Sequence, residues 1–316
     1  MNFQTQIPIS KESRNSISYD SKMFLLGSCF AENMANKLSF YKFRSLQNPF
    51  GILFHPKAIE QLVINAINEK KYTNEDIFLL NERWHCFDAH SSMSDSNKET
   101  LLNNLNTGLQ ATNEQLYNAS HICITLGTAW VYRHIESDHI VANCHKVPQK
   151  KFLKELLSVS EIVASLEAVI TLIKSVNRNA SIVFTVSPVR HLKDGFEQNQ
   201  LSKSHLISAI HQVVDGGRTS SYFPSYEIMM DELRDYRFYA EDMIHPNETA
   251  IQYIWNRFTE VWISEGAKTT MQEVEKVQNG LSHKPFNPKS EAHLQFLTRL
   301  HDDIKKLQKI HPHITF

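Results

Sequence analysis

Short apolar runs separated by helical patterns constrain the fold of this sequence most strongly. Residues 23–27 (MFLLG) and 121–127 (HICITLG) end at glycine, whereas residues 181–188 (SIVFTVSP) and the weaker 220–226 (SSYFPSY) are interrupted by proline. Runs of this length are typical of buried parallel strands. Apolar residues recur at helical spacing in residues 55–70, 160–176 and 247–263, and Ser160 and Asn247 are the expected N-caps of the last two. Strands that alternate with helices predict a three-layer α/β fold with a mostly parallel sheet.

Two parts of the chain depart from this alternation. Residues 83–94 and 129–145 alternate in polarity, which predicts a hairpin or extra strands beside the sheet. After residue 264 the sequence is rich in Lys, Glu, Gln and His, and one amphipathic helix is expected at 290–308. We therefore expect residues 1–263 to form the main domain and residues 264–316 to form a C-terminal helical extension packed on it.

Composition excludes several classes of function. The 33 basic and 34 acidic residues give a net charge of -1, which provides no electrostatic footprint for nucleic acid. The basic stretch at 146–154 is interpreted as a solvated loop and a helix entry. No run approaches the ~18 apolar residues of a membrane helix, and the polar N-terminus has no signal-peptide pattern. Because no CxxC pair occurs, we expect reduced thiols in a cytoplasmic protein. The cysteines are Cys29, Cys86, Cys123 and Cys144.

Polar residues directly after the apolar runs are the candidates for chemistry. In open α/β sheets, ligands bind outside the carboxyl ends of the strands. Ser28 and Cys29 follow the first run, and both are potential nucleophiles at the start of a helix. Adjacent residues cannot both face one base, so the sequence leaves two alternatives. Backbone N–H groups at a helix start favour a thiolate, so a reactive Cys29 should ionise more readily than an ordinary cysteine.

A second candidate lies late in the chain, at Asp242 and His245. This Asp-x-x-His spacing lets the carboxylate accept a hydrogen bond from one imidazole nitrogen while the other faces a nucleophile. Two histidine and cysteine clusters are weaker candidates for a functional site. His85, Cys86 and His90 lack the paired spacing of a zinc site, and so do Cys144 and His145. Without a GxGxxG or P-loop motif, we expect no cofactor and no metal.

Five segments, taken together, resemble a known family. They are LLGSCFAEN, NPFGILFHP, LGTAWVY, SPVRH and YFPSYEIMMDELRDYRFYAEDMIHPN. Over roughly residues 20–262 the chain is similar to the GSCFA family, a branch of the SGNH (GDSL-like) hydrolase superfamily. The resemblance implies a flavodoxin-like three-layer fold. It also implies an enzyme in which a nucleophile after the first strand attacks an ester and a late histidine is the base.

The resemblance assigns roles residue by residue. His245 matches the base and Asp242 the residue that orients it. Gly51 looks like the oxyanion glycine of the second block, and Thr128 stands where the superfamily has an asparagine. With Gly27 aligned to the glycine of Gly-Asp-Ser, Cys29 takes the nucleophile position and Ser28 the position before it. Residues of the shared motifs that could line the substrate pocket are His55, Trp84, His90 and Arg190.

The expected function is transfer of an acyl group from an ester or thioester through a covalent acyl-enzyme. Water as acceptor makes the protein a hydrolase, and a sugar or other hydroxyl makes it an acyltransferase. Expected partners are an acyl ester of a small molecule or saccharide, or an acyl-CoA thioester. Because the superfamily asparagine is absent, the alternative is a non-catalytic ligand-binding protein that retains the cleft.

Overall fold

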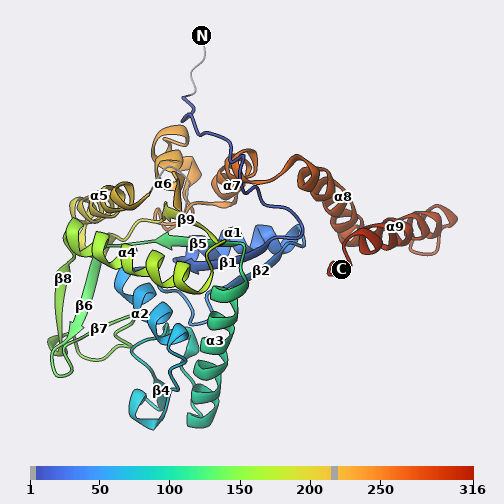
Figure 1. The fold of residues 1–316 in the computed structure, drawn as a ribbon. Helices are drawn as coiled ribbons and strands as arrows, with labels where there is room; N and C mark the ends of the chain where they lie inside the picture. The colour runs from blue at the N-terminus through green and yellow to red at the C-terminus, as the bar shows by residue number, and fades with distance from the viewer. Residues whose placement is uncertain (1–4, 215–219) are drawn as a thin grey trace.

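The computed structural model describes residues 5–214 and 220–316, and within these ranges a five-stranded parallel sheet lies between two layers of helices (Figure 1). The strand order is β10-β9-β5-β1-β2. The strands are β1 (Lys22–Gly27), β2 (Arg44–Gln47), β5 (His121–Leu126), β9 (Ser181–Val186) and β10 (Ser220–Phe223). This order is that of a flavodoxin-like doubly wound sheet, which confirms the fold predicted from the sequence.

Helices occupy most of the chain between and after these strands. The longer helices are α1 (Cys29–Phe40), α2 (Pro56–Ile67), α3 (Lys98–Asn118), α4 (Val159–Val176), α5 (Phe196–Val213), α7 (Glu248–Trp262), α8 (Glu265–Ser282) and α9 (Glu291–Ile310). The short ones are η1 (Asn74–Asp76), η2 (Ser91–Met93), η3 (Gln149–Lys151), η4 (Leu192–Asp194), α6 (Ser225–Glu227), the π-helix η5 (Ile228–Glu232) and η6 (Tyr236–Phe238).

The two faces of the sheet bury two separate hydrophobic cores. Along β1, Phe24 and Leu26 belong to the core under α2, α3, α4 and α5, whereas Met23 and Leu25 belong to the core under α1 and α7. Successive side chains of a strand point to opposite faces, so a strand covered on both sides must be apolar throughout. This double burial explains why the central strands appear in the sequence as continuous apolar runs.

Additional antiparallel strands lie beside the main sheet. β3 (Phe78–Leu80) pairs with β4 (Arg83–His85), and β6 (Trp130–His134) lies between β7 (His139–Val141) and β8 (Phe152–Leu156). The predicted extra strands are confirmed. The interpretation of 146–154 as a loop and helix entry is wrong at its end, because residues 152–156 form β8 and pair with β6 along its whole length. β2 was missed because its sequence, RSLQ, carries little apolar signal at the sheet edge.

Helix starts follow side-chain capping. Asn247 caps α7 as predicted, its side chain accepting from the Ala250 N–H at 3.1 Å. The N-cap of α4 is Ser158 rather than Ser160, because Ser158 forms a reciprocal capping box with Glu161. Both hydrogen bonds of that box satisfy otherwise unpaired N–H groups, and a serine two residues later cannot provide them.

The C-terminal helices α8 and α9 extend from the rest of the fold (Figure 1). α9 matches the helix expected at 290–308, whereas α8 was not predicted. Val274, Leu307 and Ile314 are buried in the core that includes α1 and α7, and the Tyr19 ring lies 4.8 Å from the His311 ring. In the ranges that the structure describes, no helix combines the length and the apolar character needed to span a membrane.

Candidate active site

The turn after β1 places the candidate nucleophiles at the carboxyl edge of the sheet. Gly27 has a φ of +132°, and a Cβ at this position would lie 2.1 Å from the Thr125 carbonyl oxygen. Only glycine fits so close to the neighbouring strand in this conformation. The next amide, Ser28 N–H, donates to the same Thr125 carbonyl at 3.1 Å. The chain therefore leaves β1 against β5 and enters α1 at Cys29.

Ser28 and Cys29 have different environments. Ser28 is 1% exposed, and its Oγ caps α1 by accepting from the Phe30 N–H at 3.2 Å. Cys29 is the first residue of α1 and is partly exposed, with a free thiol. Ser28 thus has a capping role in the fold, and Cys29, which packs partly against the core of α1 and α7, is the more exposed of the two.

The pKa of Cys29 departs from the sequence-based expectation. Burial raises the pKa of this thiol above its usual value, and the carboxylate of Glu32, one turn along α1, adds to the increase. The N–H groups of Cys29 and Phe30 and the charge of Lys203 act in the opposite direction. The prediction of a thiolate-rich Cys29 is therefore wrong for the free protein, because desolvation outweighs the helix start.

Asp242 and His245 form the pair expected from their spacing. Asp242 Oδ2 accepts from His245 Nδ1 at 2.6 Å, while Oδ1 accepts the backbone N–H groups of Ile244 and His245 at 2.9 and 3.0 Å. These hydrogen bonds lower the pKa of the exposed Asp242 carboxyl to about 2, the backbone bond from His245 contributing most. The carboxylate holds Nδ1 as the donor nitrogen, which leaves Nε2 as the nitrogen able to accept a proton.

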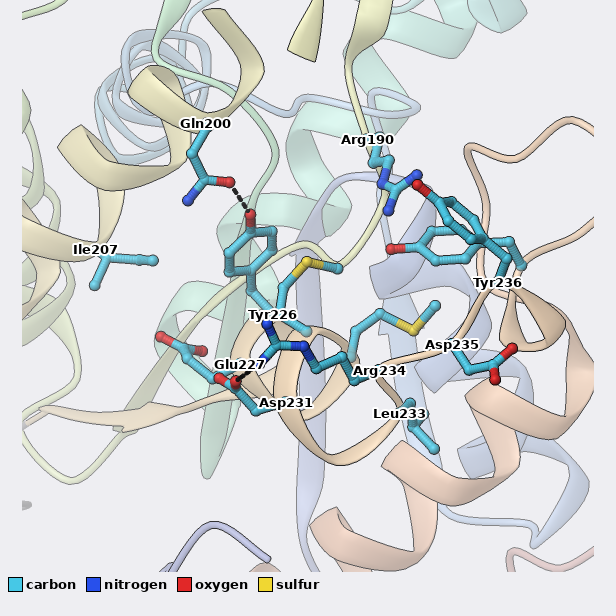
Figure 2. A pocket seen from close by; sticks show the side chains of 13 residues that line it. Arg190, Gln200, Ile207, Tyr226, Glu227, Asp231, Leu233, Arg234, Asp235 and Tyr236 are labelled. Carbon is cyan, nitrogen blue, oxygen red and sulfur yellow. Dashed lines mark hydrogen bonds and ion pairs between the residues drawn. The ribbon is translucent and has the colours of Figure 1, made fainter. Parts of the chain in front are cut away.

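Arg190 attaches the His245 loop to the end of β9. Its N–H donates to the Ile244 carbonyl at 3.2 Å, and its guanidinium lies 4.1 Å from the centre of the Tyr239 ring. Figure 2 shows Arg190 beside Tyr236, at one side of a hollow of about 490 Å³. Across the described ranges, no hydrogen bond joins the Cys29 thiol to His245. Cys29, at the start of α1, and His245, in the loop before α7, thus lie at the same sheet edge without a hydrogen bond between them.

The two expected oxyanion donors already have partners. The Gly51 N–H donates to the Asn48 carbonyl at 2.8 Å, so this amide is not free in the structure. The Thr128 hydroxyl accepts from the Trp130 N–H at 3.1 Å and shares a hydrogen bond of 2.9 Å with the Ser202 hydroxyl. Thr128 keeps its own proton free only when Ser202 donates to it. Gly51 is therefore left out of the proposed donors, and Thr128 is retained.

Asn48, which follows β2, was not recognised from the sequence as a residue of the site. Its Oδ1 accepts the Gly27 N–H at 2.9 Å, which fixes the orientation of the side-chain amide. Its Nδ2 is buried with no hydrogen-bond partner among the described residues. A buried unpaired donor next to the nucleophile turn is costly for folding. The available signal was the Asn of NPFG, where an asparagine precedes proline directly after a strand.

Lys203 was also missed as a member of the site, whereas His191 follows the third apolar run, in the SPVRH segment quoted for the resemblance. The fully buried Lys203 ammonium donates to the carbonyls of Gly127 and Ser187, each at 2.7 Å. Burial, the Lys203 charge and then His245 lower the pKa of His191 to about 3, so this imidazole is neutral at physiological pH. Its buried Nε2 has no partner in the described part of the chain. Lys203 stands in no sequence motif, and only the fold brings it to this edge.

Of the residues predicted to bind substrate, His55 lines the second cavity described below, whereas Trp84 lies in a separate hairpin. His55 is buried and caps α2 through Nδ1, while Nε2 contacts the Val141 carbonyl at 3.1 Å, so both ring nitrogens are used by the fold. Trp84 lies in the β3–β4 hairpin under the Lys98 ammonium, 4.9 Å from the ring centre. Trp84 is therefore left out of the proposed site, and His55 stays in it as a residue of the cavity wall whose ring nitrogens are held by the fold. His90 lies beside Gly51: a Cβ added to Gly51 would be 2.6 Å from the Cβ of His90.

A second cavity of about 450 Å³ borders the strand ends. Thr128 and His191 line it from the ends of β5 and β9, and Trp130 and Tyr132 contribute aromatic surface from β6. Lys154 lies 4.4 Å from the Trp130 ring centre and pairs with Asp194. Its walls thus combine apolar surface with a few polar groups, as ligand pockets do. Of the described residues, no three or more potential metal ligands come together.

The fold and the strand-end residues define a three-layer α/β protein with a cysteine at the start of the first helix and a histidine oriented by aspartate. The chain belongs to the GSCFA family, which it matches over residues 22–258, and residues 274–316 match the C-terminal domain of GSCFA domain proteins. No curated protein matches the sequence.

Two solved structures are similar at low identity. One is a carbohydrate esterase of family 3 from Talaromyces cellulolyticus, with a TM-score of 0.38, 8% identity and coverage of 81% of this chain and 99% of the other. The second is the acetyl xylan esterase Est2A from the rumen bacterium Butyrivibrio proteoclasticus, with a TM-score of 0.38, 12% identity and coverage of 88% and 66%.

Proposed function

We propose that this protein transfers an acyl group from an ester or thioester through a covalent intermediate on Cys29. The observation that carries the proposal is the presence at one sheet edge of a free, partly exposed thiol and of an imidazole oriented by a carboxylate at 2.6 Å. The first group suits a nucleophile and the second a general base. The absence of a hydrogen bond between them in the free protein does not contradict this assignment, since catalytic hydrogen bonds often form only when substrate is bound.

The proposed reaction has two halves. His245 Nε2 takes the proton of Cys29, and the thiolate attacks the acyl carbonyl carbon. The bond from that carbon to the leaving oxygen or sulfur breaks, and the leaving group takes the proton from His245. An acceptor, either water or a hydroxyl, then gives its proton to His245 and attacks the thioester, and the departing Cys29 sulfur takes that proton back from His245. Asp242 stays ionised throughout and holds the tautomer of His245.

The cavity that contains Trp130 and Tyr132 is the proposed position of the substrate. It adjoins Thr128 and His191 at the strand ends, and its aromatic side chains offer flat apolar surface to an acyl chain or a sugar ring. Esters of small molecules or saccharides and acyl-CoA thioesters therefore remain the proposed substrates.

A panel of substrates tests the proposal. It contains short-chain p-nitrophenyl esters, acetylated saccharides and acyl-CoA thioesters, each assayed with and without a sugar acceptor. We expect turnover of at least one class and an acyl adduct on Cys29 in mass spectra of the quenched enzyme. Release of acid without acceptor identifies a hydrolase, and acylated sugar identifies an acyltransferase.

The occupied Gly51 and Thr128 groups favour a second function, a non-catalytic ligand-binding protein. Saturable binding of a panel member, with no turnover and no adduct under any condition, would establish that function and refute the enzymatic one. Titration of the intrinsic Trp fluorescence is a suitable binding assay, because Trp130 lines the cavity.

The Thr128 hydroxyl is proposed to donate to the oxyanion of the tetrahedral intermediate. Thr128→Val should lower kcat on the order of 10- to 1,000-fold with little change in KM, because the hydroxyl acts mainly when the oxyanion has formed. Thr128→Ser keeps the hydroxyl and should stay close to the wild type. Steady-state kinetics of the two variants check this. Unchanged turnover in Thr128→Val would instead direct attention to Asn48 Nδ2.

A further inference from the structure

The cavity that contains Trp130 and Tyr132 has more positive than negative groups in its wall. Its charged residues are Lys146, Lys154, Lys193 and Asp194. The two histidines of the wall, His55 and His191, are neutral at physiological pH, because burial lowers their pKa values to about 4 and about 3. Burial also raises the pKa of the Cys144 thiol to about 11, so this group adds no negative charge. Three ammonium groups therefore share the wall with a single carboxylate.

Strand alternation decides which charges of β6 and β8 face the cavity. Trp130 and Tyr132 line it from β6, and Lys154 lines it from β8, directly opposite Tyr132 in the register. Arg133 and Glu155 are the next residues along the two strands, and they form an ion pair with each other at 2.9 Å. Because successive side chains point to opposite faces, that pair lies on the other side of these strands. The carboxylate of β8 is thus kept out of the cavity, while its ammonium faces inward.

The carboxylates of the β6–β8 segment and of η4 are each paired with another cation. These pairs are Asp194 with Lys154, Glu155 and Asp138 with Arg133, and Glu136 with Lys151. In the described ranges, neither Lys146 nor Lys193 forms an ion pair with a carboxylate. The Lys193 ammonium instead lies 3.5 Å from the Tyr132 hydroxyl and 5.5 Å from the centre of its ring. Two positive charges of the wall therefore have no counter-charge from the protein.

These two lysines lie at the open end of the cavity. Both are exposed, whereas Thr128, at the end of β5, is only 5% exposed. His191 lies at the end of the neighbouring strand, and its buried Nε2 has no hydrogen-bond partner in the part of the chain that the structure describes. The cavity thus joins a positively charged mouth to buried polar groups at the sheet edge.

We propose that the substrate carries an anionic group, a carboxylate or a phosphate, which binds at this mouth as the counter-charge to Lys146 and Lys193. The inference rests on the proposed function only in taking this cavity as the substrate site. An acidic saccharide ester and an acyl-CoA thioester share the required chemistry, since ammonium groups bind both kinds of anion as point charges. The ester or thioester bond then lies toward Thr128, and a neutral ester leaves the two ammonium groups unpaired.

The test compares ligands that differ only in the anionic group and that the protein cannot turn over. One pair is methyl glucuronide and methyl glucoside, and the other is the S-ethyl thioethers of 4′-phosphopantetheine and pantetheine. Isothermal titration calorimetry of the wild type at low ionic strength gives the four Kd values. We expect the acid of at least one pair to bind about 10-fold more tightly than its neutral match, because hydrogen bonds to charged groups are the stronger ones. The preference should shrink as salt is added.

The pair that shows the preference identifies the source of the anion, a sugar acid or a phosphate. Equal affinities within both pairs would overturn the proposal.

Variants assign the preference to the mouth of the cavity. Lys193→Met should reduce it about threefold, the effect of one exposed ion pair, and Lys146→Met combined with Lys193→Met should abolish most of it. Affinities for the neutral ligands should stay the same. Lys305→Met is the matched control, because it removes one charge from an exposed lysine of α9. A preference that survives in the double variant, or that falls equally in Lys305→Met, would refute the assignment.

The outcome is independent of Cys29, because none of the four ligands can acylate it. Acid-selective binding together with the absence of turnover and adduct in the substrate panel would support this inference and refute the enzymatic function. Turnover of neutral esters without any acid preference in binding would support the enzymatic function and overturn this inference.

Discussion

Replacement of Cys29 by alanine is expected to reduce turnover of the best substrate on the order of 10⁴- to 10⁶-fold, to the level of the uncatalysed reaction assisted by binding alone. The reason is that the acyl group has no other partly exposed nucleophile at the start of α1. Melting temperature should change little, because Cys29 is partly exposed and has no hydrogen-bonding role in capping. Initial rates and the mass of the quenched enzyme check the prediction, since the acyl adduct must disappear as well.

Ser28→Ala is the control for this experiment. Ser28 caps α1, so its loss should lower the free energy of unfolding by about 1 kcal/mol while leaving most of the turnover. Thermal unfolding followed by circular dichroism measures the first effect. The opposite pattern, with an inactive Ser28→Ala and an active Cys29→Ala, would make Ser28 the nucleophile despite its burial.

The second large effect is expected for Asp242→Asn, which should lower kcat about 10³- to 10⁴-fold. Asparagine keeps Oδ1, which accepts the N–H groups of Ile244 and His245, so the loop should hold its shape. The group that replaces Oδ2 is an NH₂, which donates to His245 Nδ1 instead of accepting from it. The imidazole then carries its proton on Nε2 and cannot take the proton of Cys29.

Kinetics and thermal unfolding of Asp242→Asn test this explanation together. Asp303→Asn on α9, which loses its ion pair with Lys276, is the matched control and should retain full activity. A marked fall in melting temperature with intact turnover would show that Asp242 supports the fold rather than His245.

The pKa of Asp242 determines the pH above which turnover can be measured with this carboxylate ionised. Its pKa in the folded protein, about 2, lies below the ordinary value of 3.8. A depressed carboxyl pKa contributes stability that is fully present above the unfolded value and is lost as pH falls through the folded one. The contribution of Asp242 is therefore lost only between about pH 4 and 2, and the carboxylate is ionised wherever turnover is measured.

The parts of the fold that the sequence predicted are those with strong local signals. β1, β5 and β9 are apolar on both faces, and α7 begins at a good capping residue, so each was found close to its observed bounds. β2 was missed because an edge strand of mostly polar residues leaves no clear pattern, and β8 was missed because its start was interpreted as part of a solvated loop and a helix entry. The Asp242–His245 pair was found because both partners lie within one short loop.

The remaining members of the candidate site come from distant segments. Lys203 is surrounded by polar residues in the sequence, and nothing local distinguishes it from a solvent-exposed lysine of a helix. Its burial follows from the packing of α5 against the ends of β5 and β9. Asn48 likewise gains its role only because β2 pairs with β1, which brings its Oδ1 to the Gly27 N–H.

The sequence by itself determined the class of fold, the position of the Ser28–Cys29 turn and the orientation of His245 by Asp242, because each depends on residues within a few positions of one another. The tertiary structure decided which of the two adjacent residues faces outward, which way the pKa of Cys29 moves and which donors are already occupied. Those properties depend on burial and on charges carried by other elements. Desolvation and electrostatic interactions act through space, so they are defined only once α1, α5 and the strand ends are packed together.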